Sequence, residues 1–167
     1  RCRSLRTLFS AAPPGSRVLD LGCGPGTDFA AMLGATYTIT AVESSPAMVQ
    51  QARRRVVELS AANVIDVRHL AIERLEELTP AVFDAAYSSF GPLNCVANLD
   101  EVAASLAARL RPGGLLVASV IGRFCPWEMA LYAWKRNRRR IQIRFSREVV
   151  SVPLGSGAPD LERIRVA

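Results

Sequence analysis

Apolar residues recur along this chain with two spacings that alternate. Short runs of β-branched and other apolar residues are typical of buried strands, whereas apolar residues repeated every three or four positions are typical of amphipathic helices. Strands are predicted over residues 17–21, 37–42, 64–70, 82–88 and 115–121. Helices are predicted over residues 3–12, 27–34, 46–59 and 99–110, with a short helical or turn segment over 72–78. This alternation indicates an α/β fold whose mostly parallel strands are joined by right-handed crossovers.

Proline and glycine mark the ends of several predicted elements. Pro13-Pro14-Gly15 is expected to end the first helix, and Pro112-Gly113-Gly114 is expected to end the helix before the fifth strand. Ser44-Ser45-Pro46 predicts a helix start, with a capping serine and a proline in the first turn. The fifth strand is apolar throughout, which predicts a central position in the sheet. Beyond residue 125 the pattern weakens, although a helix is expected over 127–134 and a strand over 148–152.

The length of 167 residues predicts one domain, residues 1–167, and the hydrophobic share of 50% is sufficient for a packed core. The longest apolar run is too short to cross a bilayer, and no apolar stretch typical of a signal peptide follows the N-terminal Arg1-Cys2-Arg3. We therefore expect a soluble, cytoplasmic protein without a membrane span. Because the chain does not begin with methionine and ends inside a predicted strand, we also expect it to be a fragment.

The formal net charge of +6 comes almost entirely from arginine, since the chain contains a single lysine. Alanine is also abundant, and both biases fit a GC-rich genome, so the charge is not taken as evidence for a nucleic-acid partner. The basic residues 135–147 are interpreted as a solvated face, with binding of an acidic substrate as the alternative. The cysteines have no metal-ligand spacing, so we expect free thiols and no metal site. They are Cys2, Cys23, Cys95 and Cys125.

A glycine-rich turn follows the first predicted strand. Gly22, Gly24 and Gly26 have the spacing G-x-G-x-G, whereas a dinucleotide-binding loop requires G-x-G-x-x-G and would place its third glycine at Thr27. The spacing therefore disfavours a nicotinamide-dependent oxidoreductase. Asp20 lies inside the strand, two residues before the first glycine, where a carboxylate among apolar neighbours needs a partner.

Residues 18–26, Val-Leu-Asp-Leu-Gly-Cys-Gly-Pro-Gly, resemble the first motif of class I S-adenosylmethionine-dependent methyltransferases. The resemblance extends to residues 83–90 and 110–114. It implies a Rossmann-like three-layer sandwich with strand order 3-2-1-4-5 and a C-terminal hairpin, and it implies S-adenosyl-L-methionine as the cofactor. A narrower similarity, over residues 89–95 and 122–128, is to bacterial small-molecule and quinone-pathway methyltransferases.

The resemblance assigns roles to residues around the glycine turn. It implies that Asp20 contacts the methionyl ammonium, and that the glycines let the backbone approach the amino-acid portion of the cofactor, where a Cβ would push the ligand away. Glu43, which ends the second predicted strand, is expected to accept both ribose hydroxyls. The cofactor-binding residues are expected to be Asp20, Gly22, Cys23, Gly24, Gly26, Glu43, Ser44, Met48, Ile72 and Ser88.

The adenine end departs from the family pattern. An acidic residue that follows the third strand often contacts the adenine in this family, but Ala71 stands at that position here. The resemblance therefore leaves the Ile72 backbone, or Glu73 as a substitute, to serve the adenine edge.

The end of the fourth predicted strand is expected to face the reactive methyl group and to form a wall of the active site. The candidates for this wall are Ser88, Ser89 and Phe90. No catalytic residue is assigned, because His69 and Tyr87 are both interpreted as structural residues rather than bases. Asn94 has two equal interpretations, as a polar anchor or as a helix cap.

Methyl transfer from a sulfonium is an in-line displacement that depends on alignment more than on a strong base. The Asn/Asp-Pro-Pro-aromatic motif typical of amino-group methylation on nucleobases and glutamine is absent after the fourth strand, where Ser88-Ser89-Phe90-Gly91 stands. We therefore predict methyl transfer to a small-molecule acceptor. The alternatives are an RNA methyltransferase, which only the basic charge favours, and a non-catalytic domain of the same fold.

Overall fold

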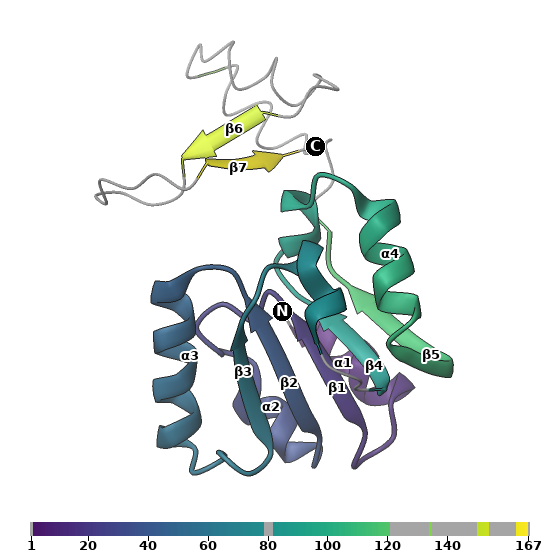
Figure 1. Cartoon of the computed structure of the whole chain (residues 1–167). Coiled ribbons are helices and arrows are strands. Elements are labelled where there is room, and N and C mark those ends of the chain that lie inside the picture. Colours follow the sequence, from purple (N-terminus) through teal and green to yellow (C-terminus); the bar gives the residue numbers. More distant parts are fainter. Residues whose placement is uncertain (1, 79–81, 121–133, 135–149, 154–162, 167) are drawn as a thin grey trace.

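The computed structural model describes residues 2–78, 82–120, 134, 150–153 and 163–166, in which helices and strands alternate along the chain (Figure 1). The strands are β1 (Arg17–Leu21), β2 (Thr38–Glu43), β3 (Ile65–His69), β4 (Phe83–Ser88), β5 (Leu110–Ala118), β6 (Val150–Pro153) and β7 (Arg163–Val166). The α-helices are α1 (Cys2–Ala11), α2 (Phe29–Gly34), α3 (Pro46–Glu58) and α4 (Leu99–Ala107). Two 3₁₀ helices are η1 (Ile72–Glu77) and η2 (Pro92–Cys95).

Strands β1 to β5 form one parallel sheet in the order β3-β2-β1-β4-β5, which confirms the predicted order. Two clusters of buried side chains pack on its opposite faces. One cluster joins the sheet to α1, α2 and α3, and the other joins it to η1, η2 and α4. The molecule is therefore a three-layer α/β sandwich of the Rossmann-like type.

The alternation of side chains along β1 explains why this strand serves both layers. Val18 belongs to the cluster under the first three helices, whereas Leu19 and Leu21 belong to the cluster on the other face. Successive side chains of a strand point to opposite faces, so Asp20 lies on the same face as Val18. β1 also pairs with β2 on one side and β4 on the other, which places it in the middle of the sheet.

The predicted end of the fourth helix and the predicted position of the fifth strand are both wrong. The helix α4 ends at Ala107 rather than at residue 110, and β5 begins at Leu110, before the Pro-Gly-Gly turn. The strand starts before the turn because the Phe83 N–H donates to the Arg109 carbonyl (2.8 Å). Phe83 pairs with Leu110 and Ala85 pairs with Leu115, so the residues between Leu110 and Leu115 form an irregularity in the strand. Because β5 pairs only with β4 among the described strands, it is an edge strand and Leu116 is 47% exposed.

The strands β6 and β7 pair antiparallel as a separate two-stranded sheet. They supply the expected C-terminal hairpin, although neither pairs with β5 among the described residues. The predicted helix over 127–134, apart from residue 134, and the basic residues 135–147 lie outside the described residues. None of the described helices has the length and apolar character required to span a bilayer.

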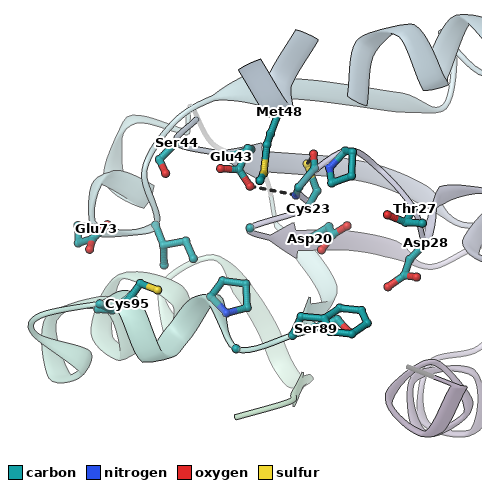
Figure 2. Close-up of a pocket in the computed structure, with 18 of the residues that line it drawn as sticks. Asp20, Cys23, Thr27, Asp28, Glu43, Ser44, Met48, Glu73, Ser89 and Cys95 are labelled. Carbon is teal, nitrogen blue, oxygen red and sulfur yellow. Dashed lines mark hydrogen bonds between the residues drawn. The ribbon is translucent and has the colours of Figure 1, made fainter. Parts of the chain in front are cut away.

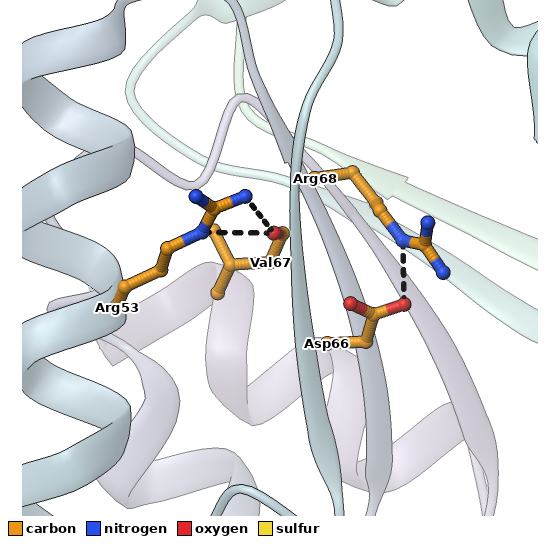
Figure 3. A network of polar contacts seen from close by, with 4 residues as sticks. All are labelled: Arg53, Asp66, Val67 and Arg68. Carbon is orange, nitrogen blue, oxygen red and sulfur yellow. Dashed lines mark hydrogen bonds and ion pairs between the residues drawn. The ribbon is translucent and has the colours of Figure 1, made fainter.

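Arg53 joins α3 to the outer edge of the sheet. Its guanidinium donates two hydrogen bonds to the Val67 carbonyl, from Nε (3.4 Å) and Nη2 (3.1 Å), and an exposed ion pair between Arg68 and Asp66 (2.7 Å) lies beside it (Figure 3). β3 is an edge strand of the described sheet, so this carbonyl has no ladder partner on that side. Arg53 thus satisfies an edge carbonyl and fixes α3 against β3.

We predict that Arg53→Ala lowers the free energy of unfolding by about 1 kcal/mol, because it removes two hydrogen bonds from a charged donor at a partly exposed site. The neighbouring Arg54→Ala is the matched control and is expected to stay within about 0.5 kcal/mol of the wild type. Urea denaturation followed by circular dichroism measures both. Equal losses in the two variants would contradict this role for Arg53.

Candidate functional site

A pocket of about 650 Å³ lies at the carboxyl ends of β1, β2 and β4 (Figure 2). The sheet order reverses on the two sides of β1, and open α/β sheets bind ligands at such a switch point. Its size is within the usual range for small-molecule sites. The lining residues are Asp20, Gly22, Cys23, Gly24, Pro25, Thr27, Asp28, Glu43, Ser44, Met48, Ile72, Glu73, Ser89, Phe90, Gly91, Pro92, Cys95, Val96 and Ala97.

The three glycines of the turn have positive φ angles, but they leave room for different neighbours. A Cβ at Gly22 would lie 2.5 Å from Pro92 Cβ, and a Cβ at Gly26 would lie 2.4 Å from the Phe29 ring. A Cβ at Gly24 would meet only Met48 Sδ, at 3.8 Å. Gly24 is therefore the glycine whose open side faces the pocket, whereas Gly22 and Gly26 make room for the protein itself.

Glu43 ends β2 and joins the glycine turn to the start of α3. Its Oε2 accepts a hydrogen bond from the Gly24 N–H (2.9 Å), drawn as the dashed line in Figure 2, and its Oε1 accepts one from the Ser45 N–H (2.9 Å). Ser45 is the N-cap residue of α3, but its side chain makes no capping bond. Each carboxylate oxygen has a second lone pair, so Glu43 is still able to accept two hydroxyl groups from a ligand.

Asp20 is a buried carboxylate that lines the pocket and is only 3% exposed. Among the residues that the structure describes, none donates a hydrogen bond to it or forms an ion pair with it. Burial, followed by the negative charges of Asp28 and Glu43, raises the pKa of Asp20 to about 8. A buried carboxylate with raised pKa fits a cationic ligand group, which would supply the missing partner.

Asp28 is a second buried carboxylate in the lining, and sequence reasoning missed it. It immediately precedes α2, is 9% exposed, and accepts a hydrogen bond from the Tyr87 hydroxyl at its Oδ2 (3.0 Å). Burial is the main cause that raises the pKa of Tyr87, so this phenol stays protonated and acts as a donor. Tyr87 is also the register partner of Asp20 across β1 and β4, so one strand pair positions both groups.

The structure brings most of the predicted cofactor residues to this pocket. Besides Asp20 and Glu43, the lining contains Gly22, Cys23, Gly24, Ser44, Met48 and Ile72. Burial raises the pKa values of the Cys23 and Cys95 thiols, so both free cysteines of the lining are neutral. Ser89 and Phe90, two of the three predicted wall residues, also line the pocket, and Glu73 lies in the lining whereas Ala71 does not.

Two predicted residues do not reach the pocket. Ser88 is fully buried and its hydroxyl donates to the Leu21 carbonyl (3.2 Å), so its side chain lies beneath the site. Gly26 is buried against Phe29, outside the lining. The step of one residue from Ser88 to Ser89 reverses the direction of the side chain, and only the second serine faces the site.

The remaining candidates lie elsewhere. His69 is exposed at the end of β3, where its Nε2 is 2.9 Å from the Ser44 carbonyl oxygen, and it does not line the pocket. Asn94 lies in η2, and the helix cap of α4 is Asn98, which accepts hydrogen bonds from the Asp100 and Glu101 N–H groups. No group of three His, Cys, Asp or Glu residues in the described part of the chain is placed to hold a metal ion.

Sequence reasoning also missed the turn after β4. Phe90 and Gly91 both have positive φ angles (65° and 78°), and this turn brings Pro92 against Gly22. The Gly91-Pro92 pair was the available signal, because this combination is typical of a sharp turn. The turn makes the segment after β4, with Cys95, Val96 and Ala97, part of the pocket wall.

Residues 18–114 match the sequence model of a family described as a methyltransferase domain. The chain belongs to the methyltransferase domain family. It is 35% identical over 118 residues to the ubiquinone biosynthesis O-methyltransferase of Xanthomonas campestris pv. campestris, which covers 67% of this chain and 46% of that protein. It is also 35% identical over 109 residues to the enzyme of the same name from Xylella fastidiosa, covering 65% of this chain and 43% of the relative. The chain thus spans about half the length of these relatives.

Solved structures of S-adenosylmethionine-dependent methyltransferases share the fold. The enzyme from Thiobacillus denitrificans, determined in complex with S-adenosyl-L-homocysteine, superimposes with a TM-score of 0.56 at 25% identity, covering 70% of this chain and 47% of that one. The enzyme from Mesorhizobium loti gives a TM-score of 0.62 at 25% identity, covering 72% and 53%. The methyltransferase domain described here therefore has the class I Rossmann-like architecture.

Because the glycines have different surroundings, alanine substitutions are expected to lower the free energy of unfolding by different amounts. Gly24→Ala is expected to destabilise the fold by about 1–2 kcal/mol, the cost of a left-handed backbone for a residue with a Cβ. Gly15→Ala is the matched control, because Gly15 has φ +83° and nothing within 4 Å of its added Cβ. Gly22→Ala is expected to cost about 1–3 kcal/mol more, because it also clashes with Pro92. Urea denaturation of the three variants measures this order, and equal losses at Gly22 and Gly24 would contradict it.

The raised pKa of Asp20 predicts a stability that depends on pH. The ligand-free fold holds the Asp20 proton more tightly than the unfolded chain, so this group destabilises the fold progressively as pH rises from 3.8 to about 8. Asp20→Asn is therefore expected to raise Tm by several degrees at about pH 9 and by much less at about pH 4. Asp66→Asn, at an exposed site on β3, is the control. A gain in Tm at Asp20 that is the same at both pH values would rule out this cause.

Proposed function

We propose that this protein is an S-adenosylmethionine-dependent methyltransferase that acts on a small-molecule acceptor. The observation that carries the proposal is the pairing of two acidic groups in one pocket. The buried Asp20 carboxylate lacks a described partner, and the Glu43 carboxylate keeps free lone pairs beside the open face of Gly24. An ammonium group complements the first carboxylate, and a pair of ribose hydroxyls complements the second.

The residues present fit the amino-acid and ribose portions of the cofactor. Asp20 would bind the ammonium group, Gly24 would let the backbone approach the amino-acid portion, and Glu43 would bind the ribose. Met48 and Ile72 offer apolar surface next to Glu43, on the side of the pocket where the base would lie. When bound, S-adenosylmethionine supplies an electrophilic methyl group. The contribution of the chain is to align this group with the acceptor and to exclude water.

Ser89 and Phe90 follow β4 and form the wall that would receive the acceptor. Both line the pocket, and Phe90 is 65% exposed. The related ubiquinone biosynthesis enzymes are O-methyltransferases by name, which supports a hydroxyl group as the accepting atom. The free thiols of Cys23 and Cys95 are typical of a reducing compartment, and we propose the cytoplasm as the place of action.

The distribution of charge supports a small acceptor over RNA. Residues 1–120, which form the pocket, contain eleven basic and eleven acidic residues, whereas residues 121–167 contain ten basic and four acidic residues. The pocket itself is lined by Asp20, Asp28, Glu43 and Glu73 and by no arginine or lysine among the described residues. Proteins bind nucleic-acid backbones chiefly through arginine and lysine, and the described lining offers neither to a phosphate. We further propose that the basic residues 135–147 attract an acceptor that carries a negative charge, such as a carboxylate.

Calorimetry with S-adenosyl-L-homocysteine tests the cofactor site. The full chain is expected to bind this ligand, and Gly24→Ala and Glu43→Ala are each expected to weaken binding at least tenfold, which corresponds to about 1.4 kcal/mol. Gly15→Ala is expected to leave the affinity unchanged. A folded wild-type protein that does not bind the ligand would refute the proposed function.

Incubation with S-adenosylmethionine labelled at the methyl group tests the acceptor. Mass spectrometry of a small-molecule extract is expected to show a labelled metabolite, and bacterial RNA treated in parallel is expected to remain unlabelled. Label in RNA alone would support the nucleic-acid alternative. Binding of the cofactor with no labelled product from either source would support a non-catalytic domain.

A further inference from the structure

We propose that His69 is a positioning residue for the ribose of the cofactor, and that it acts on the Glu43 carboxylate through the peptide group between Ser44 and Ser45. The inference rests on the proposed function and deepens it. It assigns a role in ligand binding to a side chain that lies outside the pocket, and it names the hydrogen-bonded path by which this side chain acts.

The peptide group between Ser44 and Ser45 lies between His69 and Glu43. Its carbonyl oxygen, on Ser44, is 2.9 Å from His69 Nε2, and its N–H, on Ser45, donates to Glu43 Oε1 at 2.9 Å. A trans peptide group is planar, so its C=O and its N–H point in opposite directions. A hydrogen bond to the carbonyl therefore helps to fix the direction in which the N–H points.

The chemistry of the two atoms sets the direction of the first hydrogen bond. A carbonyl oxygen carries no proton and only accepts, so His69 Nε2 is the donor and carries the proton of the ring. Hydrogen bonds in a chain polarise one another, so donation to the C=O makes the N–H of the same peptide group a stronger donor. His69 thus both orients and strengthens the bond that Ser45 gives to Glu43.

The sheet holds His69 where this contact requires it. His69 is the register partner of Glu43 in the parallel pairing of β2 and β3, and the next residue, Leu70, donates its N–H to the Glu43 carbonyl (3.0 Å). The end of β3 therefore holds the end of β2 through its backbone, and the His69 ring extends this hold to the Ser44 carbonyl. The edge strand thus supports the segment that carries the ribose-binding carboxylate.

The Glu43 carboxylate binds a ligand well only if it keeps one orientation. Its Oε2 accepts from the Gly24 N–H and its Oε1 from the Ser45 N–H, and each oxygen keeps a lone pair for a ribose hydroxyl. Figure 2 shows Ser44 beside Glu43, and both residues line the pocket. Without the His69 donor, one of the two N–H groups that orient the carboxylate is held less firmly.

A pair of ligands separates this role from a general effect on the pocket. S-adenosyl-L-homocysteine and its 2′,3′-dideoxy analogue differ only in the two ribose hydroxyls, which are the groups that Glu43 would bind. A residue that positions the Glu43 carboxylate changes the affinity for the first ligand alone. A residue that merely maintains the shape of the pocket changes the affinity for both.

The experiment is calorimetry of the full chain with both ligands. His69→Leu removes the donor and is expected to weaken binding of S-adenosyl-L-homocysteine about fivefold and binding of the analogue less than about twofold. His69→Gln is expected to stay within about twofold of the wild type for both ligands, because the glutamine amide is able to donate from a similar position. Arg68→Leu, at the neighbouring exposed position on β3, is the matched control and is expected to change neither affinity.

A double-mutant cycle tests the path through Glu43. Glu43→Ala removes the carboxylate on which His69 acts. Adding His69→Leu to this variant is therefore expected to weaken binding of S-adenosyl-L-homocysteine by less than about a further twofold. The same fivefold loss in both backgrounds would show that His69 acts by another route and would overturn the inference.

Equal losses for the two ligands in His69→Leu, an unchanged affinity for S-adenosyl-L-homocysteine, or a His69→Gln variant that binds as weakly as His69→Leu would also overturn the inference. Each of these results would leave the proposed function standing. A folded wild-type protein that binds neither ligand would overturn the proposed function, and this inference with it. Circular dichroism of each variant establishes that it is folded.

Discussion

The two hydrogen bonds that Glu43 accepts from backbone N–H groups are the interaction on which the site depends. They join the glycine turn after β1, through Gly24, to the start of α3, through Ser45. The glycines of the turn adopt left-handed conformations, and the N–H groups of Gly22 and Cys23 also donate to the Val42 carbonyl (2.9 and 3.1 Å). The Glu43 carboxylate therefore joins the glycine turn to the start of α3. The same oxygens face the space where a ribose would lie.

Side-chain packing also holds the glycine turn in place. Pro92 occupies the space over Gly22, and the Phe29 ring occupies the space beside Gly26. The turn is thus held by β2, by η2 and by α2, the helix that follows it directly. Of the three glycines, only Gly24 keeps its open side toward the pocket.

The acidic character of the pocket is costly to the ligand-free fold. Asp20, Asp28 and Glu43 are buried close enough for their charges to interact, and burial is the largest contribution to the raised pKa of Asp20. Active sites commonly retain such destabilising groups because a ligand of opposite charge compensates them on binding. For Asp20, the compensation would come from the ammonium group of the proposed cofactor.

The sequence by itself determined the alternation of strands and helices, the strand order through the family resemblance, and the positions of Asp20, Gly24 and Glu43 in the site. Hydrophobic spacing indicates which segments are buried, and the glycine spacing predicts a close approach of backbone to ligand, so both are local signals. The tertiary structure alone decided which side of each strand meets the pocket. A step of one residue separates the buried Ser88 from Ser89 in the lining, and no local pattern records that difference. Asp28 entered the site for the same reason, because its neighbour Tyr87 is 59 residues away in sequence and adjacent only in the fold.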